Sequence, residues 1–81
     1  MKIIAIYATE TMSDWEYAYL TTQVAEAEAQ VPGRFKVLFV GESLEAVRSK
    51  GGIEVVPALT LQDIQNRTDI AAFVVPGADT Y

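Results

Sequence analysis

With 81 residues and a net charge of −5, the chain is long enough for one small domain and too acidic to favour nucleic acid as a partner. Apolar residues make up 51% and charged residues 21%, a composition typical of a globular protein, which argues against a disordered one. The sequence contains neither Cys nor His. Disulfides, a cysteine nucleophile and the commonest general base are therefore excluded within these residues.

The first predicted element is a buried strand over residues 2–8, a continuous apolar run rich in Ile. The run is far shorter than the roughly 20 apolar residues that span a bilayer. It also lacks the longer apolar region and the cleavage site of a signal peptide. We therefore expect no membrane partner and a cytoplasmic location.

A polar loop over residues 9–12 leads into a helix predicted at residues 14–30. Spacings of three and four residues put one apolar stripe on the core face. The stripe consists of Tyr17, Leu20, Val24 and Ala27. The segment Val31-Pro32-Gly33 then ends the helix, because Pro and Gly occupy their usual stop positions there.

The remaining side chains of this helix divide into two groups. Glu26 and Glu28 are expected on the solvated face. Trp15 and Tyr19 lie four residues apart, off the main stripe, and form an aromatic pair. We expect simple packing for this pair, with coverage of Glu16 or an oligomer contact as the alternatives.

After the helix, residues 35–40 read as a second buried strand. Residues 46–56 resemble a β-ribbon that turns at Gly51 and Gly52, and we expect these two glycines to serve only that turn.

A short helix follows, from Thr60 to about Asn66. Its start carries a capping-box pattern in which Asp63 takes the place of Glu. The last buried strand is predicted at residues 70–75, and it leads directly into the turn Pro76-Gly77-Ala78-Asp79.

Three buried strands separated by crossovers predict an α/β fold with a doubly wound parallel sheet. In such sheets, ligands bind outside the carboxyl ends of the strands, where the strand order reverses. If the first and last strands are neighbours, Glu16 and the turn at Gly77 meet there. One full helix and one short helix are too few to cover both faces, so we expect residues 1–81 to be the front part of a larger domain.

Glu16 itself has two interpretations. With Ser13 it completes the pattern Ser-x-x-Glu ahead of an apolar helix, which is a capping box. At the end of a strand and the start of a helix, it also occupies a place suited to a catalytic carboxylate. The two roles exclude each other, because a side chain folded back onto Ser13 does not point into the crevice.

The segments TMSDWEYAYL, GGIEVVPALTLQDI and DIAAFVVPGAD, in this order, resemble the N-terminal portion of the ThiJ/PfpI family. This family belongs to the class I glutamine amidotransferase-like superfamily and has a flavodoxin-like sandwich fold. The resemblance extends over nearly the whole chain and implies that residues 1–81 form the N-terminal part of one such domain, with the remainder absent. Its members include cysteine-dependent proteases or amidases, aldehyde-processing enzymes and chaperones.

The resemblance also implies roles for individual residues. Glu16 matches the helix-borne acid that hydrogen-bonds a cysteine nucleophile. Gly77 and Ala78 match the turn whose backbone N–H groups serve the oxyanion, although Ala78 stands where the family often has Gly. The nucleophile and any histidine partner are expected beyond Tyr81. By this resemblance, the 81 residues alone are inactive.

The leading hypothesis is therefore part of a cysteine hydrolase or amidotransferase-like protein that acts on a small molecule or peptide, as a homodimer and without a cofactor. A flavodoxin-like binding module is one alternative, although the loop at residues 9–13 lacks glycine. A non-catalytic chaperone or stress-type oligomer is the other. Glu10, Asp14 and Asp79 cluster at the predicted crevice, but nothing in their spacing demands a metal, and we expect none.

Overall fold

The computed structural model describes residues 1–79. In chain order the elements are β1 (Lys2–Tyr7), α1 (Asp14–Gln30), β2 (Phe35–Gly41), β3 (Val47–Arg48), β4 (Glu54–Val55), β5 (Leu59–Thr60), α2 (Leu61–Gln65) and β6 (Ile70–Val74). The three strands and two helices expected from the sequence are confirmed, with ends that differ by a residue or so. Within residues 1–79, neither helix has the length and apolar character needed to cross a membrane.

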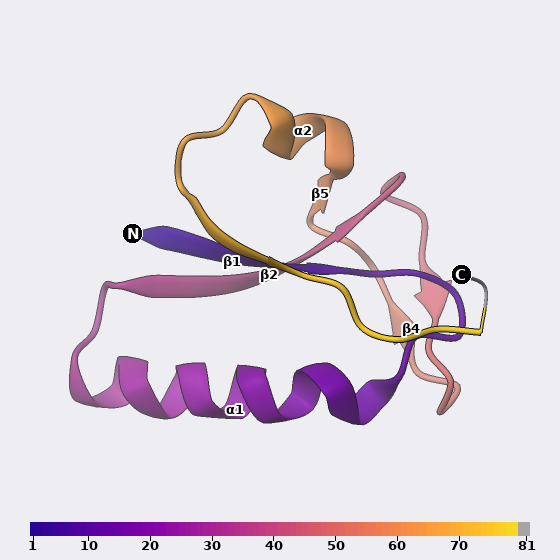
Figure 1. Cartoon of the computed structure of the whole chain (residues 1–81), viewed down its shortest axis with the longest axis horizontal. Coiled ribbons are helices and arrows are strands. Elements are labelled where there is room, and N and C mark those ends of the chain that lie inside the picture. Colours follow the sequence, from indigo (N-terminus) through magenta and orange to yellow (C-terminus); the bar gives the residue numbers. More distant parts are fainter. Residues whose placement is uncertain (80–81) are drawn as a thin grey trace.

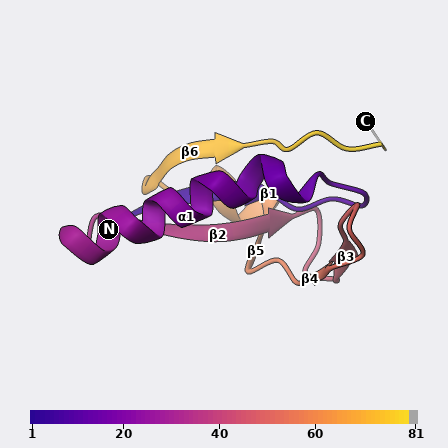
Figure 2. The ribbon, with the colours of Figure 1, turned by 90° about the horizontal axis from the view of Figure 1, so that it is seen from below.

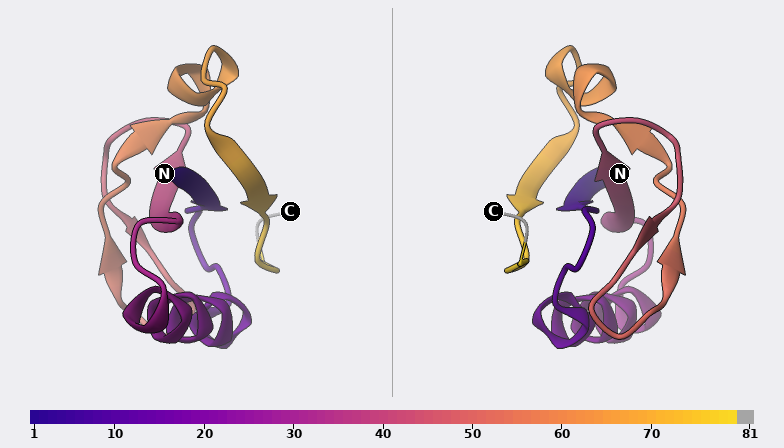
Figure 3. Two further views of the ribbon diagram at one scale, coloured as in Figure 1. Left: turned by 90° about the vertical axis from the view of Figure 1, so that its left-hand side faces the viewer. Right: turned by 90° about the vertical axis from the view of Figure 1, so that its right-hand side faces the viewer.

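The main sheet is parallel and has the strand order β5-β2-β1-β6. Helix α1 lies on one face of this sheet and the short α2 on the other (Figures 1 and 3). The predicted doubly wound parallel sheet is therefore confirmed. Strand β5 was not predicted, because two residues are too few to produce a periodic pattern; it pairs with the end of β2 at Val40 and Gly41.

Strand β1 occupies the centre of the core. Residues Ile3 to Ile6 are at most 9% exposed, because β1 has neighbours on both sides and a helix on each face. Side chains alternate between the two faces of a strand. Ile3 and Ala5 form the core cluster with Val40, against which α2 packs. On the α1 face, Ile6 is in register with Phe39, whose ring packs edge-on against Tyr17 at 5.3 Å.

The expectation that the last strand is buried is wrong. Strand β6 is half-buried only at its two ends, and Phe73 is 44% exposed. It lies at one edge of the sheet, whereas α1 packs against β2 on the other side of β1. An apolar strand is buried only where another element covers it, and nothing among residues 1–79 covers the outer side of β6.

The ribbon over residues 46–56 is confirmed as a short antiparallel hairpin. Strands β3 and β4 pair Val47 with Val55 and Arg48 with Glu54. The turn passes through Gly52, which has a φ of 84°, a value that favours glycine. The hairpin lies beside the carboxyl ends of the sheet strands (Figure 2).

Glu28, predicted on the solvated face of α1, also makes contacts that the sequence did not indicate. Its carboxylate accepts hydrogen bonds from the backbone N–H groups of Gly33 at 2.8 Å, Arg34 at 3.1 Å and Phe35 at 2.6 Å. The bond from Phe35 contributes most to a lowered pKa of the Glu28 carboxyl. Glu28 thus joins the end of α1 to the start of β2, while Glu26 is exposed as expected.

The two predicted capping boxes differ in the structure. At α2, the Thr60 hydroxyl accepts from the Asp63 N–H at 3.1 Å and the Asp63 carboxylate accepts from the Thr60 N–H at 2.9 Å, so this box is confirmed. At α1, Ser13 is the N-cap but makes no side-chain cap bond. Its hydroxyl is buried without a hydrogen-bond partner among the described residues. Local sequence alone does not separate these two cases.

Because the two N-cap hydroxyls differ in their hydrogen bonds, we expect their replacement by Ala to change the free energy of unfolding differently. Thr60→Ala is expected to lower the free energy of unfolding by about 1 kcal/mol, the usual cost of a lost cap. Ser13→Ala is expected to be neutral or slightly stabilising, because it removes a buried hydroxyl that lacks a partner. Urea unfolding measures both values. An equal loss in the two variants would contradict the assignment of the caps.

The Glu28 contacts predict a pH-dependent loss of stability. Because the folded pKa of Glu28 lies below its ordinary value of 4.5, its contribution is present above pH 4.5 and is lost as the pH falls through the folded pKa. Glu28→Gln should lower the Tm at pH 7, and the difference from the unmodified chain should shrink at acidic pH. Glu26→Gln on the same helix is the matched control. A difference that does not change with pH would exclude the carboxylate as its source.

Candidate functional site

The candidate site lies where the strand order reverses. The chain leaves β1, crosses over α1 to β2 on one side, and later returns as β6 on the other side of β1. The loop after β1 and the turn after β6 therefore emerge side by side at the carboxyl ends of the strands (Figure 2). This is the position at which open α/β sheets place their ligand crevice.

Glu16 and Gly77 meet at this point. The Gly77 N–H donates a hydrogen bond of 3.0 Å to Glu16 Oε1, although the two residues are 61 positions apart. A Cβ atom added at residue 77 would lie 2.8 Å from Glu16 Oε2, which is closer than side-chain atoms approach. A side chain at residue 77 would therefore force the Glu16 carboxylate to move away. Of the two roles considered for Glu16, the capping role does not occur.

The turn that carries Gly77 is held against the loop after β1. The Ser13 N–H donates to the Gly77 carbonyl at 2.8 Å, and Met12 forms an antiparallel bridge with Ala78. The Asp79 N–H donates to Thr11 Oγ1 at 3.0 Å. Three successive residues of the loop, 11 to 13, thus contact the turn. Gly77 and Ala78 both lie in the crevice, as the sequence predicts, but the Gly77 N–H already has the Glu16 carboxylate as its acceptor.

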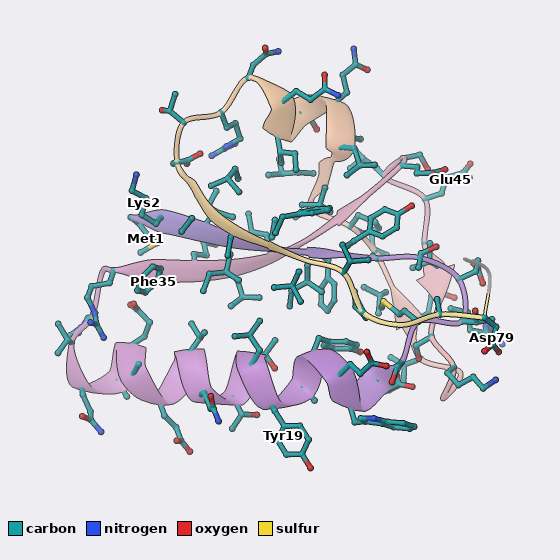
Figure 4. The ribbon with its side chains drawn as sticks, in the orientation of Figure 1. Met1, Lys2, Tyr19, Phe35, Glu45 and Asp79 are labelled. Carbon is teal, nitrogen blue, oxygen red and sulfur yellow. The ribbon has the colours of Figure 1, made fainter. Side chains whose placement is uncertain are left out.

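A pocket of about 270 Å³ opens beside this bond. It is lined by Thr11, Ser13, Trp15, Glu16, Lys50, Gly77, Ala78 and Asp79. Trp15 forms part of its rim and is 66% exposed, and Tyr19 is 71% exposed and points away from the sheet (Figure 4). The expectation that these two aromatic rings are packed is therefore wrong, because both side chains are more than half exposed.

The hairpin is a part of the site that the sequence analysis missed. The Gly51 N–H donates to Asp14 Oδ2 at 2.7 Å, and a Cβ atom at Gly51 would lie 2.8 Å from that oxygen. Gly51 therefore does more than form a turn. Lys50, from the same turn, pairs with Asp79 across the crevice. No local pattern indicates these contacts, because their partners lie 29 and 37 positions apart in the chain.

The acidic residues near the crevice are engaged with the protein itself. Glu10 Oε1 accepts from the Arg48 N–H at 3.2 Å, Asp14 binds Gly51, and Asp79 pairs with Lys50. Within residues 1–79 no group of three or more carboxylate, His or Cys side chains is suited to a metal ion. Burial raises the pKa of the Tyr17 hydroxyl, and the nearby Asp14 charge adds to this effect, so Tyr17 stays neutral beneath the site.

Comparison with known proteins identifies relatives of this arrangement. The sequence profile of the DJ-1/PfpI family matches residues 1–80. The uncharacterized protease YoaZ of Bacillus subtilis is 30% identical over a stretch that covers 96% of this chain and 38% of that protein.

Two solved structures extend the likeness to the fold. A DJ-1 superfamily protein of Agrobacterium tumefaciens is 32% identical, with a TM-score of 0.72 over 96% of this chain and 38% of that one. A ThiJ/PfpI family protein of Bacillus anthracis is 29% identical, with a TM-score of 0.72 over 95% of this chain and 37% of that one. The flavodoxin-like fold class is thereby confirmed. The chain spans about 38% of the length of these relatives.

The short distance between residue 77 and the Glu16 carboxylate predicts the effect of adding a methyl group at this position. Gly77→Ala is expected to push the Glu16 carboxylate away and break its bond to the residue 77 N–H. Amide hydrogen exchange at residue 77 should then accelerate by about tenfold, the effect of losing roughly 1.4 kcal/mol of hydrogen bonding. Ala78→Ser, in the same turn, is the control and should leave this rate unchanged. Slow exchange in Gly77→Ala would contradict the steric argument.

Proposed function

This chain belongs to the DJ-1/PfpI family, and we propose that it supplies part of the active site of a cysteine-dependent hydrolase. In this proposal, residues 1–81 form the N-terminal part of one catalytic domain, and the nucleophile comes from outside them, since they contain no Cys. The observation that carries the proposal is the 3.0 Å contact between Glu16 and the Gly77 N–H at the strand ends. It brings an acid and a backbone donor together where this fold binds ligands.

Glu16 is proposed to orient the nucleophile. A cysteine reacts as its thiolate, and the thiolate is stabilised by a neighbour that donates a hydrogen bond. A charged carboxylate would oppose the thiolate, whereas a protonated Glu16 would donate to it. The exposed side of Glu16, which borders the 270 Å³ pocket, leaves room for such a partner.

Gly77 and Ala78 are proposed to bind the oxyanion that forms when the thiolate attacks a carbonyl carbon. The Gly77 N–H donates to Glu16 before the reaction. When the Glu16 carboxyl group turns toward the sulfur, the Gly77 N–H becomes available to the oxyanion.

We propose acyl transfer as the reaction class, with a small molecule or a peptide as substrate. The relative from Bacillus subtilis carries the name of a protease, which supports this class. A homodimer and a cytoplasmic location remain predictions. A phosphate-binding, flavodoxin-like role receives less support, because the N–H groups of Thr11, Met12 and Ser13 all donate to carbonyl groups of the protein.

A chaperone-type role is the second candidate, and exposed apolar side chains favour it. Trp15 and Tyr19 project from α1, while Phe73 and Val75, 44% and 54% exposed, lie at the opposite face of the sheet with Tyr7 and Leu61. Such surfaces bind partners or unfolded chains. This role predicts that protection of an aggregating client survives alkylation of every thiol, whereas the hydrolase proposal predicts loss of activity.

The test of the proposed function is the intact mass of the protein purified from its source, with and without iodoacetamide. We expect a mass well above 8.9 kDa and one rapidly alkylated thiol. Glu16→Ala should slow alkylation at neutral pH by about tenfold, the effect of losing about 1.4 kcal/mol of thiolate stabilisation. Glu26→Ala, on the same helix, is the control.

Two results would contradict the proposal. A mass of 8.9 kDa without alkylation would exclude a cysteine enzyme. A reactive thiol whose rate is the same in Glu16→Ala and in the control would exclude Glu16 as its orienting acid.

A further inference from the structure

The β3–β4 hairpin lies apart from the main sheet but binds the loop that follows β1. The Thr11 N–H donates to the Arg48 carbonyl at 2.8 Å, and the Lys50 N–H donates to the Met12 carbonyl at 2.9 Å. Thr11 has a φ of 62°, which is unusual for a residue with a side chain. The hairpin therefore holds this loop in a conformation that the loop does not favour by itself.

The hairpin also binds the first turn of α1. Asp14 accepts the Gly51 N–H at 2.7 Å, with no room for a Cβ atom between them. Since Ser13 makes no cap bond, the start of α1 is held by the hairpin in place of its own N-cap. Glu16 lies two residues further along the same turn of α1. The hairpin therefore fixes the backbone position from which the Glu16 side chain extends.

The third contact of the hairpin reaches the turn that carries Gly77. Lys50 pairs with Asp79, and the two side chains are 58% and 60% exposed. The Asp79 N–H in turn donates to Thr11 Oγ1. Lys50 thus connects the hairpin to the turn after β6, and Figure 4 shows Asp79 at this end of the molecule.

We propose that Lys50 and Asp79 are positioning residues, whose ion pair holds the turn after β6 so that the Gly77 N–H faces Glu16. The inference rests on the proposed function, because it concerns the geometry of the same acid and backbone donor. In this proposal neither residue contacts the reacting atoms. Lys50 and Asp79 act through the backbone between Gly77 and Asp79.

Electrostatics supports a cation at this position. Glu16 and Asp79 line the same pocket, and both carry negative charge when ionised. Without Lys50, these two acidic side chains would line the pocket with no opposite charge beside them. Lys50 also lines this pocket and pairs with Asp79. Glu16 forms its hydrogen bond with the Gly77 N–H instead.

The test measures amide exchange at Gly77 in the purified protein by NMR. Lys50→Met and Asp79→Asn should each accelerate this exchange by about two- to fivefold, the range expected for an exposed ion pair. In the double variant, exchange should be no faster than in the faster of the two single variants, because both substitutions remove the same ion pair. The two substitutions change the net charge in opposite directions, so a shared acceleration does not arise from charge alone.

Lys36→Met is the matched control, since Lys36 is an exposed lysine on β2 remote from the carboxyl ends. Amides of the buried strand β1 report global stability in the same spectra. The proposal is overturned if Gly77 exchange is unchanged in both variants. It is equally overturned if Gly77 and the β1 amides accelerate together, which would indicate general destabilisation. Because no thiol enters this measurement, its outcome is separate from the alkylation test of the proposed function.

Discussion

The parallel pairing of β1 with β2 on one side and β6 on the other is the constraint on which the structure depends. It buries the four residues Ile3 to Ile6, which form most of the apolar core. It also brings the loop after β1 and the turn after β6 to the same edge. Without β6 beside β1, Glu16 would have no Gly77 to bind, and the crevice would not exist.

Helix α1 depends on its carboxylates as much as on its apolar stripe. None of its residues is fully buried. Asp14, Glu16 and Glu28 each accept backbone N–H groups from segments outside the helix, at Gly51, at Gly77 and at residues 33–35. Backbone N–H groups bind a carboxylate strongly, and at Gly51 and Gly77 the absence of a Cβ atom permits the close approach. These contacts fix the helix relative to the hairpin, the turn and the next strand.

The apolar surface is divided between the two faces of the molecule. Aromatic rings project from α1 at Trp15 and Tyr19, and Phe73 and Val75 lie on the half-covered β6 side. The net charge of −5 is carried on the same small surface. The site residues lie between these two regions, at the carboxyl ends of the strands.

Elements whose signals are local could be predicted from the amino-acid sequence. The strand β1 follows from an apolar run and the helix α1 from helical spacing. Both helices begin with a capping-box pattern, but only α2 forms the box, so the pattern alone was not sufficient. The placement of Glu16 and Gly77 in one crevice also followed, once parallel topology was inferred. The choice between two uses of the same Ser-x-x-Glu pattern depends on the tertiary fold, because the competing donor at Gly77 lies 61 positions away. The contact of Glu28 with the start of β2 and the pairing of Lys50 with Asp79 likewise depend on the tertiary fold, since they require turns that are separate in the chain to lie close together.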